Sequence, residues 1–258
     1  VGSDAELTAA AAGALERLVV CDEGRSTILA CGVGPCVQLL QDANETVQLH
    51  ALSVLRHTIA DAAGLSAVAA AQAAVPLLHM LPKDSAVDSA AFVLHRLSTD
   101  ELSCAAIAHA DGSAQLVPLL ASTSSDVGMH TLITLAAIVP HMQTLRVGAD
   151  AVAHLAAFSR DSRPQCCDSA AAVLALVAED GGHAQAILCT GGAQGLLRAS
   201  HSASEADVRV RAGTALDHLA AALFGPYTEA MRGSALLDMP LFWCEPTIGF
   251  LQPSVMQH

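Results

Sequence analysis

Histidine and cysteine are the side chains of this sequence that could do chemistry, and both are abundant. The 258 residues include 12 histidines and 8 cysteines. A zinc site needs several such ligands that converge at defined spacing, yet the histidines form no HExxH motif and the cysteines form no CxxC pair. We therefore expect histidines scattered over surfaces and interfaces, and we predict no metal ion and no other cofactor.

Two further features could suggest reactivity. The adjacent cysteines Cys166 and Cys167 could be a redox pair, but neighbouring cysteines form only strained disulfides, and both fall near the start of an expected helix. The glycine-rich stretch 191–195 lacks the Lys-Ser/Thr ending of a phosphate-binding loop and any preceding strand, so a turn explains it better. No nucleophile, base and orienting residue can be assembled. The sequence predicts no catalytic residue and no enzyme.

The amino-acid composition indicates which classes of partner and which cellular compartment to expect. The formal net charge is −13, with only 12 basic residues. Because phosphate groups bind clustered lysines and arginines, we expect neither a nucleic acid nor a membrane as partner. The longest uncharged stretch, 62–82, contains Pro76 and several polar residues, unlike a spanning helix. Cysteines scattered among alanine and leucine are typical of a reducing compartment, which favours the cytoplasm.

One sequence pattern repeats six times along the chain. An alanine-rich stretch with a central leucine recurs at intervals of 39 to 42 residues. The anchor leucines are Leu15, Leu55, Leu94, Leu135, Leu174 and Leu216. A period near forty indicates stacked helical units, because one unit cannot bury its apolar face without neighbours. The sequence therefore predicts an extended binding surface and no localised reaction centre.

Each repeat is expected to contain a long, a short and a medium helix. In one repeat Asn44 can cap the long helix, which Asp61 and Gly64 break. A short helix over 66–71 and a medium helix over 74–81 follow. We expect the same order of helices in every later repeat.

The last repeat shows the closest similarity to a known family. The stretch 190–197 contains TGGAQGLL, and the stretch 208–219 contains VRVRAGTALDHL after a polar spacer. These segments resemble the turn, second helix and third helix of armadillo repeats, and the resemblance covers residues 3–223. It implies an all-α, right-handed α-solenoid. HEAT repeats are the nearest alternative.

The resemblance also identifies a groove, because the long third helices of armadillo proteins line a concave face. Importin-type members carry asparagines and tryptophans there, which clamp extended basic peptides. The asparagine would fall two residues after each anchor leucine, where this chain has Arg17, His57, Arg96, Ala137, Leu176 and His218. The tryptophan would fall two residues before it, where the chain has Gly13, Ser53, Phe92, Ile133, Ala172 and Thr214. No position matches, which argues against the importin mode of binding.

The groove positions differ between the two halves of the array. The first half has basic side chains that can pair with carboxylates, and the second half has apolar ones. The candidate partner-binding residues are Arg17, Arg56, His57, Phe92, His95, Arg96, Ile133, Ala137, Leu176 and His218. We predict a protein partner with an extended segment that has an acidic and an apolar part. In the alternative, the basic residues only pair with acids of neighbouring repeats.

The two ends of the chain depart from the repeat. Residues 1–22 form a partial first repeat, which leads us to expect further chain before Val1; residues 23–223 form about five repeats. Residues 224–258 form a tail whose prolines favour an extended path. Its aromatic side chains are candidate anchors: Phe224, Tyr227, Phe242, Trp243 and Phe250. The tail either caps the last repeat or contacts a second protein.

These observations favour a non-catalytic scaffold or adaptor that binds proteins through the groove and the tail. By analogy with other armadillo proteins, we expect a structural subunit of a large assembly such as the ciliary axoneme, in the cytoplasm or on the cytoskeleton. The alternatives are the supporting repeat region of a larger enzyme, such as a ubiquitin ligase, and a transport receptor.

Overall fold

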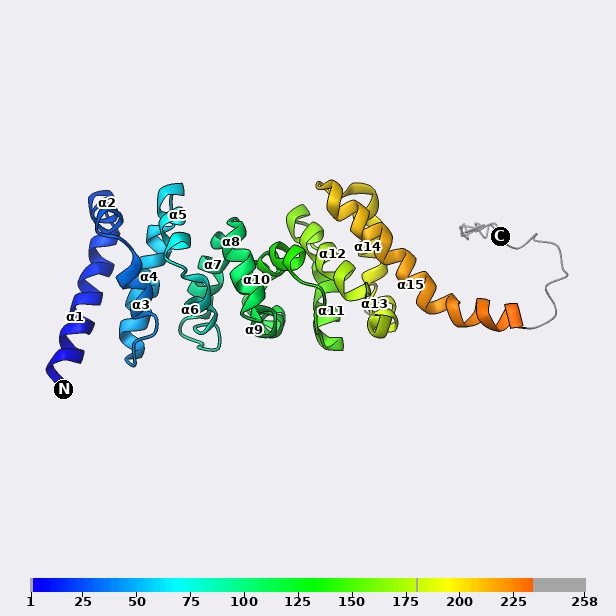
Figure 1. The fold of residues 1–258 in the computed structure, drawn as a ribbon, viewed down its shortest axis with the longest axis horizontal. Helices are drawn as coiled ribbons and strands as arrows, with labels where there is room; N and C mark the ends of the chain where they lie inside the picture. Colours follow the sequence, from blue (N-terminus) through cyan, green and yellow to red (C-terminus); the bar gives the residue numbers. More distant parts are fainter. Residues whose placement is uncertain (1, 180, 234–258) are drawn as a thin grey trace, which may run out of the picture. The chain divides into compact units, whose positions relative to one another are not determined.

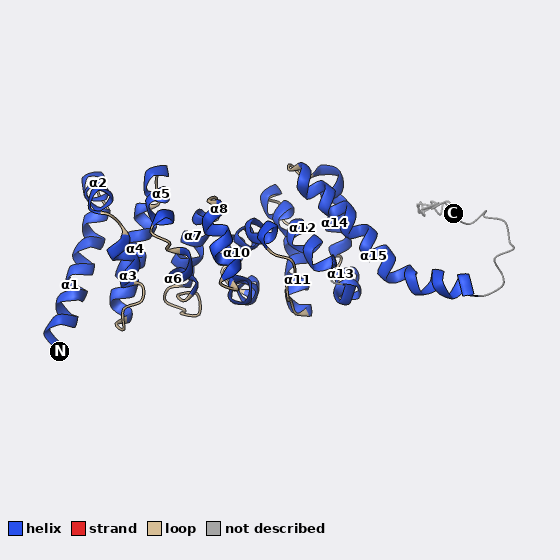
Figure 2. Cartoon of the chain, viewed as in Figure 1, coloured by secondary structure: helices blue, strands red, loops and turns tan. Residues whose placement is uncertain are grey.

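The computed structural model describes residues 2–179 and 181–233, and these residues are helical with short connections. Figure 2 shows helices and loops but no strand in this part of the chain. Contacts divide the chain into residues 1–219 and residues 220–258. In the first unit the helices follow one another in chain order, as Figure 1 shows by colour.

Three helices follow one another in most repeats, as predicted, but the predicted lengths of the second and third helices are wrong in the first three repeats. For example, the predicted short helix has 9 residues and the predicted medium helix has 5 in the repeat that begins at Glu45. We keep the names short and medium for the second and third positions in the repeat. The long helices are α1 (Gly2–Val19), α4 (Glu45–Thr58), α7 (Val87–Leu97), α10 (Ser125–Ile138), α12 (Pro164–Glu179) and α15 (Ala206–Gly233). The short helices are α2 (Asp22–Cys31), α5 (Ala62–Ala70), α8 (Glu101–His109) and α13 (Ala184–Cys189). The medium helices are α3 (Gly34–Leu39), α6 (Ala74–Leu78), α9 (Gly112–Leu116) with the 3₁₀ turn η1 (Val117–Ala121), α11 (Ala149–Phe158) and α14 (Gly192–Ser202).

The anchor leucines form the spine of the core. Leu55, Leu94, Leu135 and Leu174 are at most 1% exposed, whereas Leu15 and Leu216, in the outermost repeats, are partly buried. Consecutive long helices contact each other from α1 through α4, α7 and α10 to α12. Stacking of one repeat on the next therefore buries a single continuous core, as expected for a solenoid.

The short helices α2, α5 and α8 begin where an acceptor side chain caps them close to the end of the long helix, whereas α13 has no side-chain cap. Asp61 accepts a hydrogen bond from the Gly64 backbone N–H at 2.7 Å, and Asp100 accepts one from Ser103 at 2.8 Å. At Gly64 an added Cβ would lie 1.7 Å from the Thr58 carbonyl oxygen. Glycine is required there because the short helix starts against the backbone of the long one.

The repeat after α10 departs from the predicted order, since it has no short helix. The 3₁₀ turn η2 (Val139–His141) is followed by an irregular segment up to Gly148. Only a few residues separate η2 from α11, and Pro140 lacks the N–H that would continue a helix. Leu145, 2% exposed, fills the core in place of the missing helix.

The tail expectation is wrong for residues 224–233. Helix α15 continues through Pro226 to Gly233, so this part is helical and not extended. The alanine-rich stretch 220–222 before Pro226 has high helix propensity, which offsets the single hydrogen bond that proline removes. Phe224 and Tyr227 lie in this helix, whereas Phe242, Trp243 and Phe250 lie outside the described residues.

Candidate protein-binding surface

The predicted groove residues all lie on the long helices. Arg17 is on α1, and Arg56 and His57 are near the end of α4. The remaining positions are Phe92, His95 and Arg96 on α7, Ile133 and Ala137 on α10, Leu176 on α12 and His218 on α15. Because α1, α4, α7, α10 and α12 touch in succession, we call this face of the first unit the long-helix row.

These residues differ widely in exposure. Arg17, Arg56, His57 and His218 are exposed. Phe92, His95, Arg96, Ile133 and Ala137 are half-buried. Leu176 is only 6% exposed and belongs to the core, because α12 is buried on nearly all sides between Ala170 and Ala178. Leu176 can therefore make little contact with a partner that binds the row.

The structure brings three of the predicted residues together. The Arg56 guanidinium lies 5.1 Å from the centroid of the Phe92 ring, and its Nη1 donates to Ser89 Oγ at 2.9 Å. A cation over an aromatic face contributes about 0.5–1 kcal/mol at an exposed site. Both partners of Arg56 are neutral, and within the described residues its guanidinium group has no ion pair.

His130 on α10 completes this cluster and was missed from the sequence. Its ring meets Phe92 edge-on at 5.4 Å and stacks on His95 at 5.1 Å with an interplanar angle of 19°. The spacing contained a usable signal, because His130 precedes the groove residue Ile133 by three positions and therefore shares its helix face. We call Arg56, Phe92, His95 and His130 the aromatic cluster.

The histidines of the aromatic cluster are held neutral. Burial, the neighbouring His130 and Arg96 lower the pKa of His95 to about 4. Burial also lowers the pKa of His130, although Asp126 and Asp88 oppose it. The charge of the cluster at neutral pH therefore resides on Arg56.

Acids of neighbouring repeats do not neutralise the two arginines in the middle of the row. Arg96 donates to the Ile59 carbonyl oxygen at 3.4 Å, and neither Arg56 nor Arg96 has an ion pair within the described residues. The inter-repeat carboxylate Glu16 binds His50 instead. Hydrogen bonds from Ser53 and His50 outweigh burial and lower the Glu16 pKa.

A cleft opens farther along the row, between α10, α12 and the start of α15. Its volume is about 370 Å³. Its apolar lining includes Ile133, Ala136, Ala137, Ala172 and Val208. Its charged lining consists of Asp168, Glu205, Asp207 and Arg211. We call this the acidic cleft, because carboxylates outnumber the single cation.

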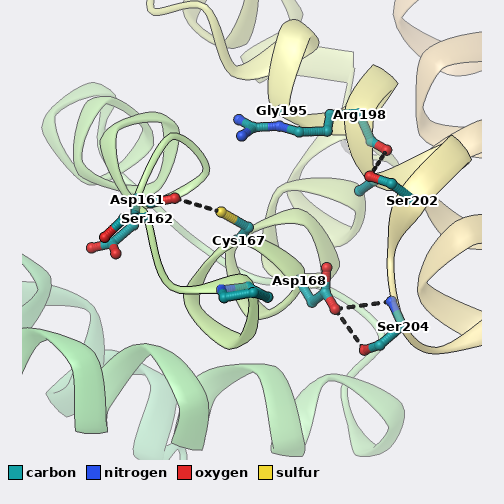
Figure 3. Close-up of a pocket in the computed structure, with 10 residues that line it drawn as sticks. Asp161, Ser162, Cys167, Asp168, Gly195, Arg198, Ser202 and Ser204 are labelled. Atoms are coloured by element: carbon teal, nitrogen blue, oxygen red, sulfur yellow. Dashed lines mark hydrogen bonds between the residues drawn. The ribbon is translucent and has the colours of Figure 1, made fainter.

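A second cavity of about 320 Å³ adjoins the acidic cleft and shares Pro164, Asp168 and Ser204 with it. Figure 3 shows Asp168 and Ser204 joined by two hydrogen bonds. Asp168 Oδ2 accepts from the Ser204 backbone N–H at 3.0 Å and from its hydroxyl at 2.6 Å. This pair ties α12 to the segment before α15 and fixes one carboxylate at the border of the two cavities.

Cys167 lines the second cavity as a hydrogen-bonded thiol. The Cys167 thiol donates to the Asp161 carbonyl oxygen at 3.0 Å, as Figure 3 shows. Burial, together with Asp161 and Asp168, raises its pKa, so it remains a thiol at neutral pH. Cys167 thus stabilises the start of α12, in agreement with its interpretation as a packing residue.

The described residues contain no group of three or more His, Cys, Asp or Glu side chains that could hold a metal ion. Within residues 2–179 and 181–233, no helix has the length and apolar character that a membrane span requires.

Comparison with known proteins identifies the fold. No family model and no curated protein sequence matches the chain. A computationally designed armadillo repeat protein for modular peptide recognition superposes with a TM-score of 0.55 and 20% identity, over 81% of this chain and 92% of that one.

Two further designed armadillo repeat proteins are similar. One has a TM-score of 0.53 and 20% identity over 82% of this chain and 92% of its own. The other, solved in complex with the peptide (KR)4, has a TM-score of 0.52 and 19% identity over 81% and 92%. Together with the observed helix order and core, these similarities confirm that the fold is an α-solenoid of armadillo-like repeats.

Proposed function

We propose that this protein is a non-catalytic scaffold or adaptor that binds other proteins through the long-helix row. The observation that carries the proposal is the aromatic cluster, which holds the exposed guanidinium group of Arg56 on that row without an ion pair in the described residues. The designed armadillo repeat protein solved in complex with the peptide (KR)4 supports peptide binding by a protein of this fold.

The first half of the row suits acidic segments. Arg17, Arg56 and His57 are exposed on α1 and α4, and Arg96 is half-buried on α7. A carboxylate that reaches these guanidinium groups would form charge-assisted hydrogen bonds, which are stronger than neutral ones. We infer that the partner presents aspartate or glutamate to helices α1–α7.

The test compares charge reversals on and off the row. Peptides selected by phage display on the wild-type protein would be measured against R17E/R96E and against R25E/R146E, a control with the same change in net charge. We expect R17E/R96E to weaken binding of acidic peptides at least about tenfold, and the control to change it little. Equal loss in both variants, or none in either, would contradict the proposal.

More specifically, we propose a structural subunit of a large cytoplasmic assembly, with the ciliary axoneme as the candidate and the tail aromatics as additional anchors. The presence of helical repeats throughout residues 2–219 supports this role, because repeat arrays provide extended docking surfaces. The test is the location of the tagged protein in ciliated cells after detergent extraction, with and without residues 234–258. Complete solubilisation of the intact protein would reject the axonemal role.

A further inference from the structure

The acidic cleft exists because small residues replace large ones along the row. Two residues before the anchor leucine, α7 has Phe92, whereas α10 has the smaller Ile133 and α12 has Ala172. One residue after the anchor, α7 has His95, whereas α10 has Ala136. Phe92, His95 and His130 fill the space between α7 and α10, and the space between α10 and α12 stays open.

The carboxylates of the cleft lack counterions. Glu205 and Asp207 are exposed, and within the described residues neither side chain has a hydrogen bond or ion pair. Asp168 is occupied by Ser204, which does not neutralise its charge. Arg211 is the single basic residue of the lining. The cleft therefore combines an apolar floor with net negative charge.

We propose that the acidic cleft binds a protein segment in which a bulky apolar side chain neighbours a lysine or arginine. The apolar side chain occupies the floor formed by Ile133, Ala137 and Ala172, and the cation pairs with Glu205 and Asp207. A volume of about 370 Å³ lies within the range of about 300–1,000 Å³ that ligand sites occupy. This inference rests on the proposed function and specifies the partner's chemistry at one position of the row.

The occupant is a segment of a partner and not the chain's own C-terminal tail. The tail, residues 224–258, contains Glu229, Asp238 and Glu245 but a single arginine, Arg232, and no lysine. Its net charge therefore has the same sign as that of the cleft. A partner that spans the row would instead carry its acidic part over α1–α7 and its apolar and basic part over α10–α15, so charge fixes its direction.

The first test uses labelled peptides of about eight residues, which span roughly 26 Å when extended. The probes are alternating Leu-Lys, alternating Ser-Lys and alternating Leu-Glu, with binding measured by fluorescence anisotropy. We expect Leu-Lys to bind the wild-type protein most tightly and E205K/D207K to weaken it at least about tenfold. The matched control is E101K/D150K, which reverses two exposed acids elsewhere and should leave binding unchanged.

The second test fills the floor without changing charge. A172F restores the size of the side chain at the corresponding position of α7, and A157F adds the same volume at an exposed site of α11. We expect A172F to abolish Leu-Lys binding and A157F to preserve it, with thermal unfolding used to confirm that both are folded. If A172F does not fold, the comparison of E205K/D207K with E101K/D150K still decides whether the cleft binds the Leu-Lys peptide.

Failure of this inference is distinguishable from failure of the proposed function. Equal affinity for Ser-Lys and Leu-Lys, or unchanged Leu-Lys affinity in E205K/D207K, would overturn the cleft proposal. If Leu-Glu binding is nevertheless lost in R17E/R96E and kept in R25E/R146E, the scaffold role of the row stands. If the wild-type protein binds none of the peptides, both the cleft proposal and the scaffold role of the row are rejected.

Discussion

The imidazole ring of His95 stacks on that of His130, with centroids 5.1 Å apart and an interplanar angle of 19°. The two residues belong to consecutive long helices, so the stack joins two repeats on the exposed row. Neither ring can take up a proton without placing a cation against its neighbour. We therefore expect this contact to make the centre of the array sensitive to pH.

Stability should fall as the pH decreases from about 6.5 toward 4. The pKa of His95 is about 4 in the folded protein and about 6.5 in the unfolded chain. Between these values the unfolded state binds more protons, so the free energy of unfolding decreases with falling pH. We expect His95 to lower the free energy of unfolding by roughly 1–3 kcal/mol across this pH range. Urea unfolding of the wild-type protein at pH 7 and pH 4.5 measures it.

The variant H95F removes the titrating group and keeps an aromatic ring against His130. Its stability should depend less on pH in this window than that of the wild-type protein. H79F, at an exposed histidine, is the control and should retain the full dependence. The same pH dependence in H95F and the wild-type protein would show that His95 is not responsible.

Substitution of Phe92 should destabilise the array in two separable steps. F92L keeps much of the apolar contact but loses the face under Arg56 and the edge contact with His130, and should cost about 1 kcal/mol. F92A also loses buried area and should cost about 2–3 kcal/mol. Thermal or urea unfolding gives both values. Equal losses of unfolding free energy in F92L and F92A would mean that Phe92 stabilises the array through its ring interactions alone.

Gly191 and Gly213 should respond to alanine in opposite directions. Gly191 has φ +81°, and an added Cβ would lie 2.9 Å from Arg160 Nη1, whose bond to the Thr190 carbonyl would be disturbed. G191A should destabilise the protein by about 1–2 kcal/mol. Gly213 is helical with open space around the Cβ position, so G213A should stabilise by about 0.5–1 kcal/mol. Urea unfolding measures the change in the free energy of unfolding of each variant. A change of the same sign in G191A and G213A would contradict this account.

Gly64 should tolerate no side chain. An alanine Cβ would lie 1.7 Å from the Thr58 carbonyl oxygen, so the short helix α5 would have to move away from α4. We expect G64A to lose about 3 kcal/mol or more, as for overpacked or strained core positions. G34A, where nothing lies within 4 Å, is the matched control. A loss in G64A no larger than in G34A would show that the helix relocates without cost.

The repeat period was enough to predict most of the fold. The anchors Leu55, Leu94, Leu135 and Leu174 are among the most deeply buried residues of their helices, because a helix must bury its apolar face against the next repeat. The predicted cap at Asn44 is also present, since its side chain accepts from Thr46 at 3.0 Å. Both features depend on local spacing, which is legible in the sequence.

Other elements could not be predicted in this way. The missing short helix after α10 reflects the few residues available before α11, and Pro226 was expected to end a helix that in fact continues. In each case a local preference competes with neighbouring residues, and the sequence does not state which prevails. Leu176 is a similar case, because its groove position was inferred without knowing that α12 is enclosed.

Local spacing along the chain thus specifies the helices, their apolar faces and the basic positions of the row, since these follow from the helical period. The aromatic cluster and the acidic cleft arise only after folding. Both depend on which side chains of successive repeats oppose each other, about forty residues apart in the sequence, and on whether their volumes fill the space between two helices. That balance of volumes is a property of packed pairs and not of any single segment.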